Sequence, residues 1–181
     1  MKTTEMMEKF EKERIRVKQT KRFIKHMEQH HKDFIIPYWS FIGDIRSIIN
    51  EYHRGEKFIQ FCYQHYTDVG YSNINRIENP DNIVYAKRKG RELYSKFELN
   101  REKRLTNKVV VVLKQSYYNE NEYHLITMFP GEINIKEVGD KNIKSIDEFN
   151  RVNKFWSNNA LVFELDKIEE DTITSENPYD L

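Results

Sequence analysis

Four residues have side chains suited to moving a proton and holding a phosphate: His65, Arg91, Lys96 and Thr127. An imidazole can remove the proton of an RNA 2′-hydroxyl, which then attacks the adjacent phosphate. Cationic and hydroxyl donors can stabilise the charge that develops on that phosphate. In this hypothesis His65 is the base or acid, Arg91 and Lys96 hold the phosphate, and Thr127 donates to a nonbridging oxygen. The reaction needs neither a metal ion nor a cofactor, and we predict none.

Each of these residues also has a purely structural explanation. His65 could be a histidine near a helix end that bonds a carbonyl group, and Arg91 and Lys96 could be two solvated cations among many. Thr127 suits a strand because of its β-propensity alone. The sequence has no GxxxxGK[ST], GxGxxG, HExxH, CxxC or GxSxG motif, so the usual nucleotide-binding, zinc and serine-hydrolase signatures do not supply an alternative chemistry.

Charge is unevenly distributed along the chain. Between Arg76 and Lys114 there are eleven Lys or Arg against five Asp or Glu, and from Glu137 to the end there are five against eleven. A basic middle and an acidic end favour a polyanion-binding face, although solvated surface explains them as well. Tyrosines in the basic stretch could stack on unpaired bases. The predicted RNA-binding residues are Lys87, Arg88, Tyr94, Lys108 and Lys114.

Length and composition bound the class of protein. The 181 residues suit one domain with an added terminal element, and 38% hydrophobic with 33% charged residues is ordinary for a folded chain. No run approaches the roughly 18 apolar residues of a membrane-spanning helix. Cys62 is the single cysteine and cannot form an internal disulfide, which favours a reducing cytoplasm. The first residues have no apolar signal-peptide core.

The N-terminal third is predicted to be helical. Residues 1–34 contain no Pro or Gly and carry apolar residues near helical spacing, and Pro37 should end this segment. We predict a helical extension over residues 1–36 and a single α+β domain over 37–181. Within that domain we expect a turn or short strand at Gly43, a helix through Ile45 and Ile49, and a second helix over 57–66 that carries His65 near its end.

A series of strands should follow. The segments 82–86, 92–99 and 108–114 have strand patterns, and KVVVVLK at 108–114 is β-branched enough for a strand buried on both faces. The segment 123–129 should form its hairpin partner, and 159–166 should add a further strand. Helices followed by an antiparallel meander predict an α+β fold, with N-terminal helices packed on one face of a mostly antiparallel sheet.

Several short motifs resemble those of a known nuclease group. FIGDI, YQHY with His65, ENPDNIVY, KVVVVLK and LITMFPG with Thr127 are similar to the phage-borne branch of the barnase, EndoU, colicin and RelE-like nuclease superfamily. The resemblance covers residues 42–131. It implies a helix-plus-sheet fold, an endoribonuclease of toxin or phage origin, and catalytic roles for His65 and Thr127. Asn159 stands where a histidine would be less surprising, so His53 or His124 would have to supply a second imidazole.

The leading hypothesis is therefore a cytoplasmic, metal-independent endoribonuclease that binds RNA and is restrained by a cognate inhibitor or antitoxin protein. The first alternative is a non-catalytic nucleic-acid-binding module. The second alternative is a phage-encoded protein-interaction factor that inhibits a host enzyme through the N-terminal helix and acidic tail. Phosphate contacts would make nucleic-acid affinity strongly salt-dependent, whereas the protein-interaction factor would show no such affinity.

Overall fold

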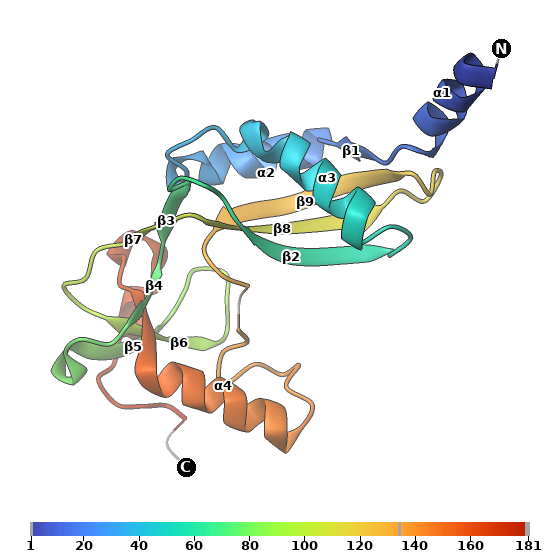
Figure 1. Cartoon of the computed structure of the whole chain (residues 1–181). Helices are drawn as coiled ribbons and strands as arrows, with labels where there is room; N and C mark the ends of the chain where they lie inside the picture. Colours follow the sequence, from blue (N-terminus) through green and yellow to red (C-terminus); the bar gives the residue numbers. More distant parts are fainter. Residues whose placement is uncertain (1, 134, 180–181) are drawn as a thin grey trace. The chain divides into compact units, whose positions relative to one another are not determined.

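The chain has an α+β fold in the computed structural model, which describes residues 2–133 and 135–179. Its helices and strands belong to two compact units, and the chain passes between them three times (Figure 1). Unit 1 consists of Met1–Tyr71 and Thr106–Ile133, and unit 2 consists of Ser72–Leu105 and Asn134–Leu181. Each unit has its own hydrophobic core.

Unit 1 is built on a four-stranded sheet. Its strands lie in the order β1 (Arg16–Lys18), β9 (Glu122–Pro130), β8 (Lys108–Gln115) and β2 (Phe58–Gln64). β1 is parallel to β9, and the other pairs are antiparallel. β8 is an interior strand, as its β-branched sequence predicted, and Val109, Val110 and Val111 are fully buried.

Helices cover one face of this sheet. α2 (Lys21–His30) and α3 (Ile42–Tyr52) run above the strands in Figure 1, while α1 (Lys2–Glu13) precedes them in the chain. Phe23 and Met27 of α2 pack in one core with Ile45 and Ile49 of α3 and with the inward side chains of the strands. The predicted α+β fold is confirmed, and α2 and α3 contribute side chains to the core of unit 1. No described helix is long and apolar enough to cross a membrane.

Two local predictions in unit 1 were wrong. The segment predicted as a helix over 57–66 is largely strand β2, because its burial alternates with period two: Ile59 and Phe61 are buried and Phe58 and Gln60 are exposed. Its aromatic residues also fit helical spacing, which misled the prediction. Gly43 lies within helix α3 rather than in a turn or strand.

A bulge changes the pairing of β9 with β8. Leu125 pairs with Leu113, but the next pair is Thr127 with Val112, so Ile126 is the extra residue. The extra residue lets Leu125 and Met128 both enter the core although they are three positions apart. Thr127 consequently points to the face opposite the core, which we call the open face.

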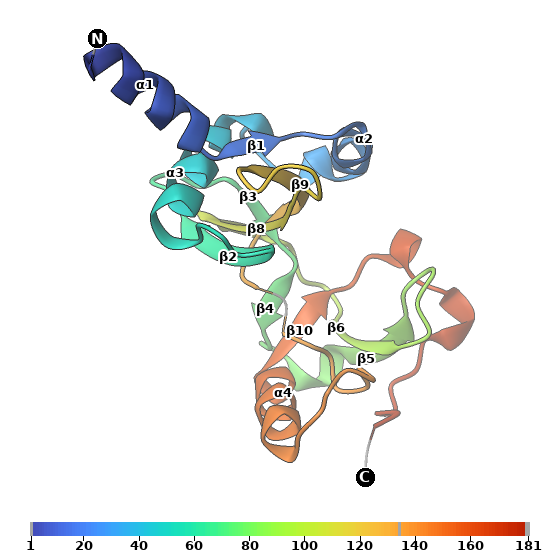
Figure 2. The same cartoon turned by 90° about the vertical axis from the view of Figure 1, so that its right-hand side faces the viewer.

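Unit 2 combines a second four-stranded sheet with one helix. The strands lie in the order β4 (Ile74–Arg76), β10 (Asn159–Val162), β6 (Tyr94–Glu98) and β5 (Ile83–Lys87), and only β10 and β6 are parallel. Figure 2 shows α4 (Ile146–Asn158) next to these strands. Val152 and Trp156 of α4 pack against Phe97 and Leu161. Short 3-10 helices occupy His31–Asp33, Tyr38–Phe41, Pro80–Asn82, Leu165–Lys167 and Glu170–Thr172.

The division into units differs from the predicted domain boundary. The segment predicted as a separate extension belongs to unit 1, and Ile15, Phe23 and Met27 are buried in its core. Residues 37–181 in turn contribute to both units. The remaining strands, β3 (Gly70–Ser72) and β7 (Arg104–Thr106), pair with each other, and each contains a point where the chain passes from one unit to the other.

Candidate functional site

The four predicted catalytic residues are divided between the units. His65 and Thr127 belong to unit 1, and Arg91 and Lys96 belong to unit 2. Within unit 1, Thr127 pairs with Val112, which pairs with Gln60, whereas His65 lies five residues beyond Gln60. At roughly 3.3 Å per residue this is about 16 Å along the strand direction. His65 and Thr127 are therefore not neighbours in the sheet.

His65 has a local structural environment at the end of β2. Its Nδ1 lies 3.2 Å from Thr67 Oγ1 and accepts a 3.3 Å hydrogen bond from the Thr67 amide. Its ring packs on Phe41 with a centroid distance of 5.2 Å and on Tyr66 at 4.3 Å. These contacts hold the ring beside the aromatic end of the core.

Thr127 instead contacts a histidine that sequence reasoning missed. His26 Nε2 of α2 lies 3.0 Å from Thr127 Oγ1, across 101 residues of sequence. Phe23 and Met27 anchor α2 in the core, so the adjacent His26 is held at the edge of β9. The His26 ring is also 4.7 Å from the ring of His30, one helical turn away.

Strand register places further candidates on the same open face. Lys18 of β1 pairs with His124 of β9, and His124 pairs with Lys114 of β8. Directly paired residues project to the same face, so the three side chains form a row across the sheet. His124 Nε2 lies 3.6 Å from Glu122 Oε2. We call Lys18, His26, Lys114, His124 and Thr127 together the histidine face.

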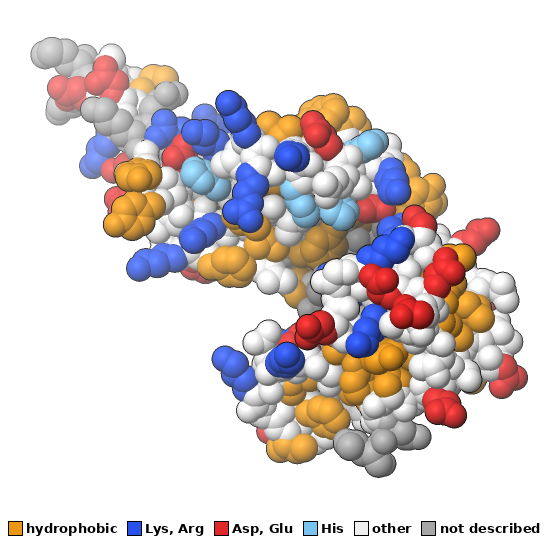
Figure 3. Space-filling view, turned by 180° about the vertical axis from the view of Figure 1, so that it is seen from behind, with side chains coloured by type: hydrophobic (Ala, Val, Ile, Leu, Met, Phe, Trp, Pro, Cys, Tyr) orange, Lys and Arg blue, Asp and Glu red, His pale blue; other side chains and the backbone are white. Residues whose placement is uncertain are grey.

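A dense group of cations borders the histidine face. Between Arg14 and Lys32 there are seven Lys or Arg against the single acidic residue Glu28. All seven are exposed, and none forms an ion pair within the described residues. We call them the basic strip: Arg14, Arg16, Lys18, Lys21, Arg22, Lys25 and Lys32. Figure 3 shows Lys and Arg gathered around histidines on this unit.

Over residues 1–34 as a whole there are ten Lys or Arg against six Asp or Glu, so the excess of positive charge is less concentrated there than in the basic strip. A narrower window over residues 14–32 would have found it. The strip also lacks the usual local compensation, since the first turn of α2 contains Lys21 and Arg22 and no acidic residue. Cations there add to the positive end of the helix dipole.

The electrostatics of His26 favour its neutral form. Burial lowers the pKa of His26, and the neighbouring His30 lowers it further. A neutral imidazole can accept a proton, which a general base must do. His26 therefore meets a requirement that sequence reasoning had assigned to His65.

Most predicted RNA-binding residues of unit 2 already have partners. Arg88 Nη2 forms a 2.7 Å ion pair with Glu137 Oε2, and both side chains are largely buried. Lys87 lies over the ring of Tyr94, with Nζ 5.1 Å from the centroid. Arg91 is exposed in the β5–β6 loop. In unit 1, Lys108 pairs with Glu132 and Lys114 is exposed on the histidine face.

Lys96 has a structural role and an unusual environment. Its Nζ donates a 2.6 Å hydrogen bond to the Trp156 carbonyl in the last turn of α4. A cation at this end of a helix interacts favourably with the helix dipole. Burial lowers the pKa of Lys96. Lys96 forms no ion pair in the part of the chain that the structure describes. Among the described residues, this half-buried amine therefore lacks a counter-charge.

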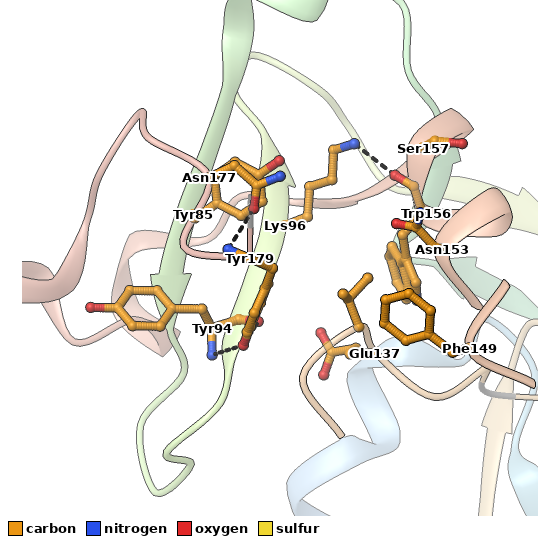
Figure 4. Close-up of a pocket in the computed structure, with 11 residues that line it drawn as sticks. Tyr85, Tyr94, Lys96, Glu137, Phe149, Asn153, Trp156, Ser157, Asn177 and Tyr179 are labelled. Carbon is orange, nitrogen blue, oxygen red and sulfur yellow. Dashed lines mark hydrogen bonds between the residues drawn. The ribbon is translucent and has the colours of Figure 1, made fainter. Parts of the chain in front are cut away.

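Lys96 lines a cavity of about 300 Å³ within unit 2, which we call the tyrosine pocket (Figure 4). Figure 4 shows three tyrosines on one side of Lys96 and the side chains of α4 on the other. Its aromatic lining consists of Tyr85, Tyr94, Phe149, Trp156 and Tyr179. Its polar lining consists of Lys96, Glu137, Asn153, Ser157 and Asn177.

The C-terminal segment completes the tyrosine pocket. The Tyr179 hydroxyl accepts a 3.0 Å hydrogen bond from the Tyr94 amide and lies 3.1 Å from the Tyr94 carbonyl. Gly139 permits this close packing, since a Cβ there would lie 2.5 Å from the Tyr179 hydroxyl. Glu137 Oε1 is buried without a hydrogen-bond partner, while its other oxygen bonds Arg88.

Neither a metal cluster nor an activated thiol adds to these sites. Within residues 2–133 and 135–179, no group of three or more His, Cys, Asp or Glu side chains is arranged to hold a metal ion. Burial raises the pKa of the Cys62 thiol, and its Sγ lies 3.5 Å from the Gly131 carbonyl. Cys62 thus has the environment of a structural cysteine.

Comparisons with known proteins add a likeness of fold. No family model and no curated protein matches this chain. A crystal structure described as a conserved hypothetical protein from Toxoplasma gondii ME49 is similar with a TM-score of 0.51 and 8% sequence identity. The match covers 74% of this chain and 89% of that chain. At this identity the similarity concerns the fold alone.

Proposed function

We propose that this protein is a metal-independent endoribonuclease that binds and cleaves RNA at the histidine face of unit 1. One observation carries the proposal: His26 Nε2 lies 3.0 Å from Thr127 Oγ1, beside cations that lack ion-pair partners among the described residues. A base, a hydroxyl donor and phosphate-binding cations are the groups that RNA transesterification requires.

In the proposed reaction, neutral His26 removes the proton of the RNA 2′-hydroxyl. The 2′-oxygen forms a bond to the adjacent phosphorus, and the bond from phosphorus to the 5′-oxygen breaks. The substrate hydroxyl replaces Thr127 as the partner of His26, which frees the Thr127 hydroxyl to donate to a nonbridging oxygen. Lys18 and Lys114 stabilise the phosphate charge. The products are a 2′,3′-cyclic phosphate and a 5′-hydroxyl.

His124 is the proposed acid that protonates the departing 5′-oxygen. It lies three residues before Thr127 on β9, about 7–10 Å away along the bulged strand. The carboxylate of Glu122, 3.6 Å from His124 Nε2, can pair with the ring when it is protonated. In this proposal His26 acts as the base and His124 as the acid, both beside Thr127.

The surroundings support binding of an extended RNA strand. The basic strip supplies exposed cations for successive phosphates, and the first turn of α2 adds the positive end of a helix dipole. Tyr117 and Tyr118 in the β8–β9 turn are each 93% exposed, where they can stack on unpaired bases. Arg16 lies next to this turn, because its amide bonds the Asn121 carbonyl.

The same cations favour a second candidate, a non-catalytic nucleic-acid-binding protein. It shares the salt-dependent affinity of the nuclease but leaves RNA intact.

As part of our proposal, the nuclease works in a reducing cytoplasm, which suits the free thiol of Cys62. We also propose that it is of toxin or phage origin and has a protein inhibitor.

The proposal is tested by incubating purified protein with total RNA in EDTA and analysing the product ends. We expect 2′,3′-cyclic phosphate ends, and no cleavage of a matched oligonucleotide with 2′-deoxyribose at every position. RNA that is bound but remains intact would favour the non-catalytic candidate. Cleavage of the deoxy oligonucleotide would contradict the mechanism, because the attacking 2′-hydroxyl is missing there.

A further inference from the structure

The tyrosine pocket of unit 2 combines three features that the proposed reaction at the histidine face does not use. Its walls are aromatic, with Tyr94 and Trp156 among them. One polar group is a half-buried amine without a carboxylate partner in the described chain, that of Lys96. Another is a carboxylate oxygen, Glu137 Oε1, which is buried and lacks a hydrogen-bond partner.

We infer that the tyrosine pocket binds a guanine base. A cavity of about 300 Å³ has room for a planar bicyclic base with part of its sugar. Aromatic walls suit a flat π-system, which proteins bind by stacking when a base is unpaired. The inference rests on the proposed function only in naming RNA as one source of the base.

Glu137 and Lys96 favour guanine among the four bases. Glu137 Oε1 is a carboxylate oxygen and can accept hydrogen bonds, while the other oxygen of the carboxylate pairs with Arg88. Lys96 can only donate. Guanine presents two adjacent donors, N1–H and the N2 amino group, beside the O6 acceptor. The donors suit Glu137 and the O6 acceptor suits Lys96.

The other bases match less well. Adenine presents the N1 lone pair on its Watson–Crick edge, which would face the carboxylate oxygen without a proton between them. Cytosine and uracil present at most one donor group on that edge and fill less of the cavity. An unmatched buried carboxylate oxygen or amine loses its hydration without compensation, so these bases should bind more weakly.

The first experiment titrates nucleosides into the full-length Trp39→Phe variant, in which Trp156 is the remaining tryptophan. Trp156 lines the pocket, so its fluorescence reports occupancy. We expect guanosine to bind, with inosine, which lacks the N2 amino group, and adenosine at least about tenfold weaker, the effect of losing one good base contact. Equal responses to guanosine and adenosine, or none to guanosine, would overturn the inference.

Variants then assign the contacts. Glu137→Gln keeps an oxygen for Arg88 but turns an amide donor toward the guanine donors, so guanosine affinity should fall about tenfold or more. Lys96→Met keeps the side-chain length without the donor and should also weaken binding. Asp166→Asn changes an exposed acid that does not line the pocket and is the matched control. Unchanged guanosine affinity in a folded Lys96→Met protein would contradict the proposed O6 contact.

Two further titrations identify the source of the base. A single-stranded RNA containing one guanosine should displace guanosine if the pocket reads RNA, and the same RNA with inosine should displace it less. Displacement by free guanosine monophosphate but by neither RNA assigns the pocket to a nucleotide. The His26→Gln variant should keep its guanosine affinity, so the loss of cleavage and the loss of base binding can be told apart.

Discussion

Unit 1 and unit 2 contain the same number of Lys and Arg residues, fifteen each, but use them differently. In unit 2, Arg88 pairs with Glu137 and Arg101 pairs with Glu98, so carboxylates already neutralise these guanidinium groups. In unit 1, the seven cations of the basic strip are exposed and form no ion pair within the described residues. The positive field available to a polyanion depends on unpaired charge rather than on formal charge.

This difference also changes what the basic middle of the sequence means. Part of its charge stabilises folded turns of unit 2: Glu98 accepts hydrogen bonds from the amides of Glu78 and Asn79 while Arg101 pairs with it. Such cations are poor phosphate ligands, because binding RNA would require breaking an existing pair. In our proposal RNA therefore binds to unit 1, whose basic strip is exposed and forms no ion pair within the described residues.

The largest expected difference between the units is in RNA affinity. Replacing Arg16, Lys18 and Arg22 together by Gln should weaken binding of single-stranded RNA by about 10²-fold near 100 mM salt, and should reduce the slope of log affinity against log salt by about 2. The matched control replaces three cations of unit 2 that form ion pairs with Glu164 or Glu148 by Gln: Lys103, Lys136 and Lys167. Filter binding across a salt series measures both, and equal losses in the two variants would contradict the comparison.

A smaller effect should appear in the free energy of unfolding. Here replacing a cation of unit 2 should cost more than replacing a cation of unit 1. Arg101→Gln leaves the carboxylate of Glu98, which is 2% exposed, without its cation, so we expect unit 2 to lose about 2–4 kcal/mol. Lys25→Gln in the basic strip should change stability by less than about 0.5 kcal/mol. Urea unfolding followed by Trp156 fluorescence in a Trp39→Phe background measures unit 2. Comparable losses of unfolding free energy in both variants would show that ion pairing does not decide how much a cation contributes to stability.

The smallest expected effect is the pH dependence from His26. Its pKa in the folded protein is lowered from 6.5 by burial and by His30, while the Thr127 hydroxyl faces its ring. Above pH 6.5 His26 is neutral in both the folded and the unfolded protein, so its contribution to the free energy of unfolding is complete. As pH falls through 6.5, the unfolded state takes up a proton first, so stability declines.

The wild type should therefore lose more stability between pH 7 and 5 than His26→Gln does. Urea unfolding at several pH values tests this, with His31→Gln as a control histidine on the solvent side of the same segment. A steeper loss in His26→Gln than in the wild type would mean that the ring is stabilised as a cation, contrary to the role of a base.

The fold was predictable where one physical signal dominated. β8 follows from its run of β-branched residues, and its partner β9 follows from the polar turn between them. β2 was missed because Phe58, Phe61 and Cys62 fit helical spacing as well as a strand, and tertiary pairing with β8 decided between the two. The two-unit division was not visible because each unit is assembled from segments far apart in sequence.

The candidate site was only partly predictable for a related reason. Thr127 and Lys114 were identified from residue type and their strands. His26 is a candidate only because it contacts Thr127, which lies 101 residues away in the sequence. Ion pairs also depend on the folded geometry, so the sequence could not distinguish Arg88, which pairs with Glu137, from Arg22, which has no ion pair within the described residues. The bulge at Ile126, which directs Thr127 to the open face, has no signal in the sequence.

The central claim is that His26, rather than His65, is the base of an RNA-cleaving site on unit 1. The most direct test compares the cleavage rate of a single-stranded RNA in EDTA for the wild type, His26→Gln and His65→Gln. A Gln side chain at position 26 can still bond Thr127 but cannot take up a proton, so the rate should fall by about 10²–10⁴-fold, whereas His65→Gln should stay within about threefold. Full activity in His26→Gln together with loss in His65→Gln would contradict the account.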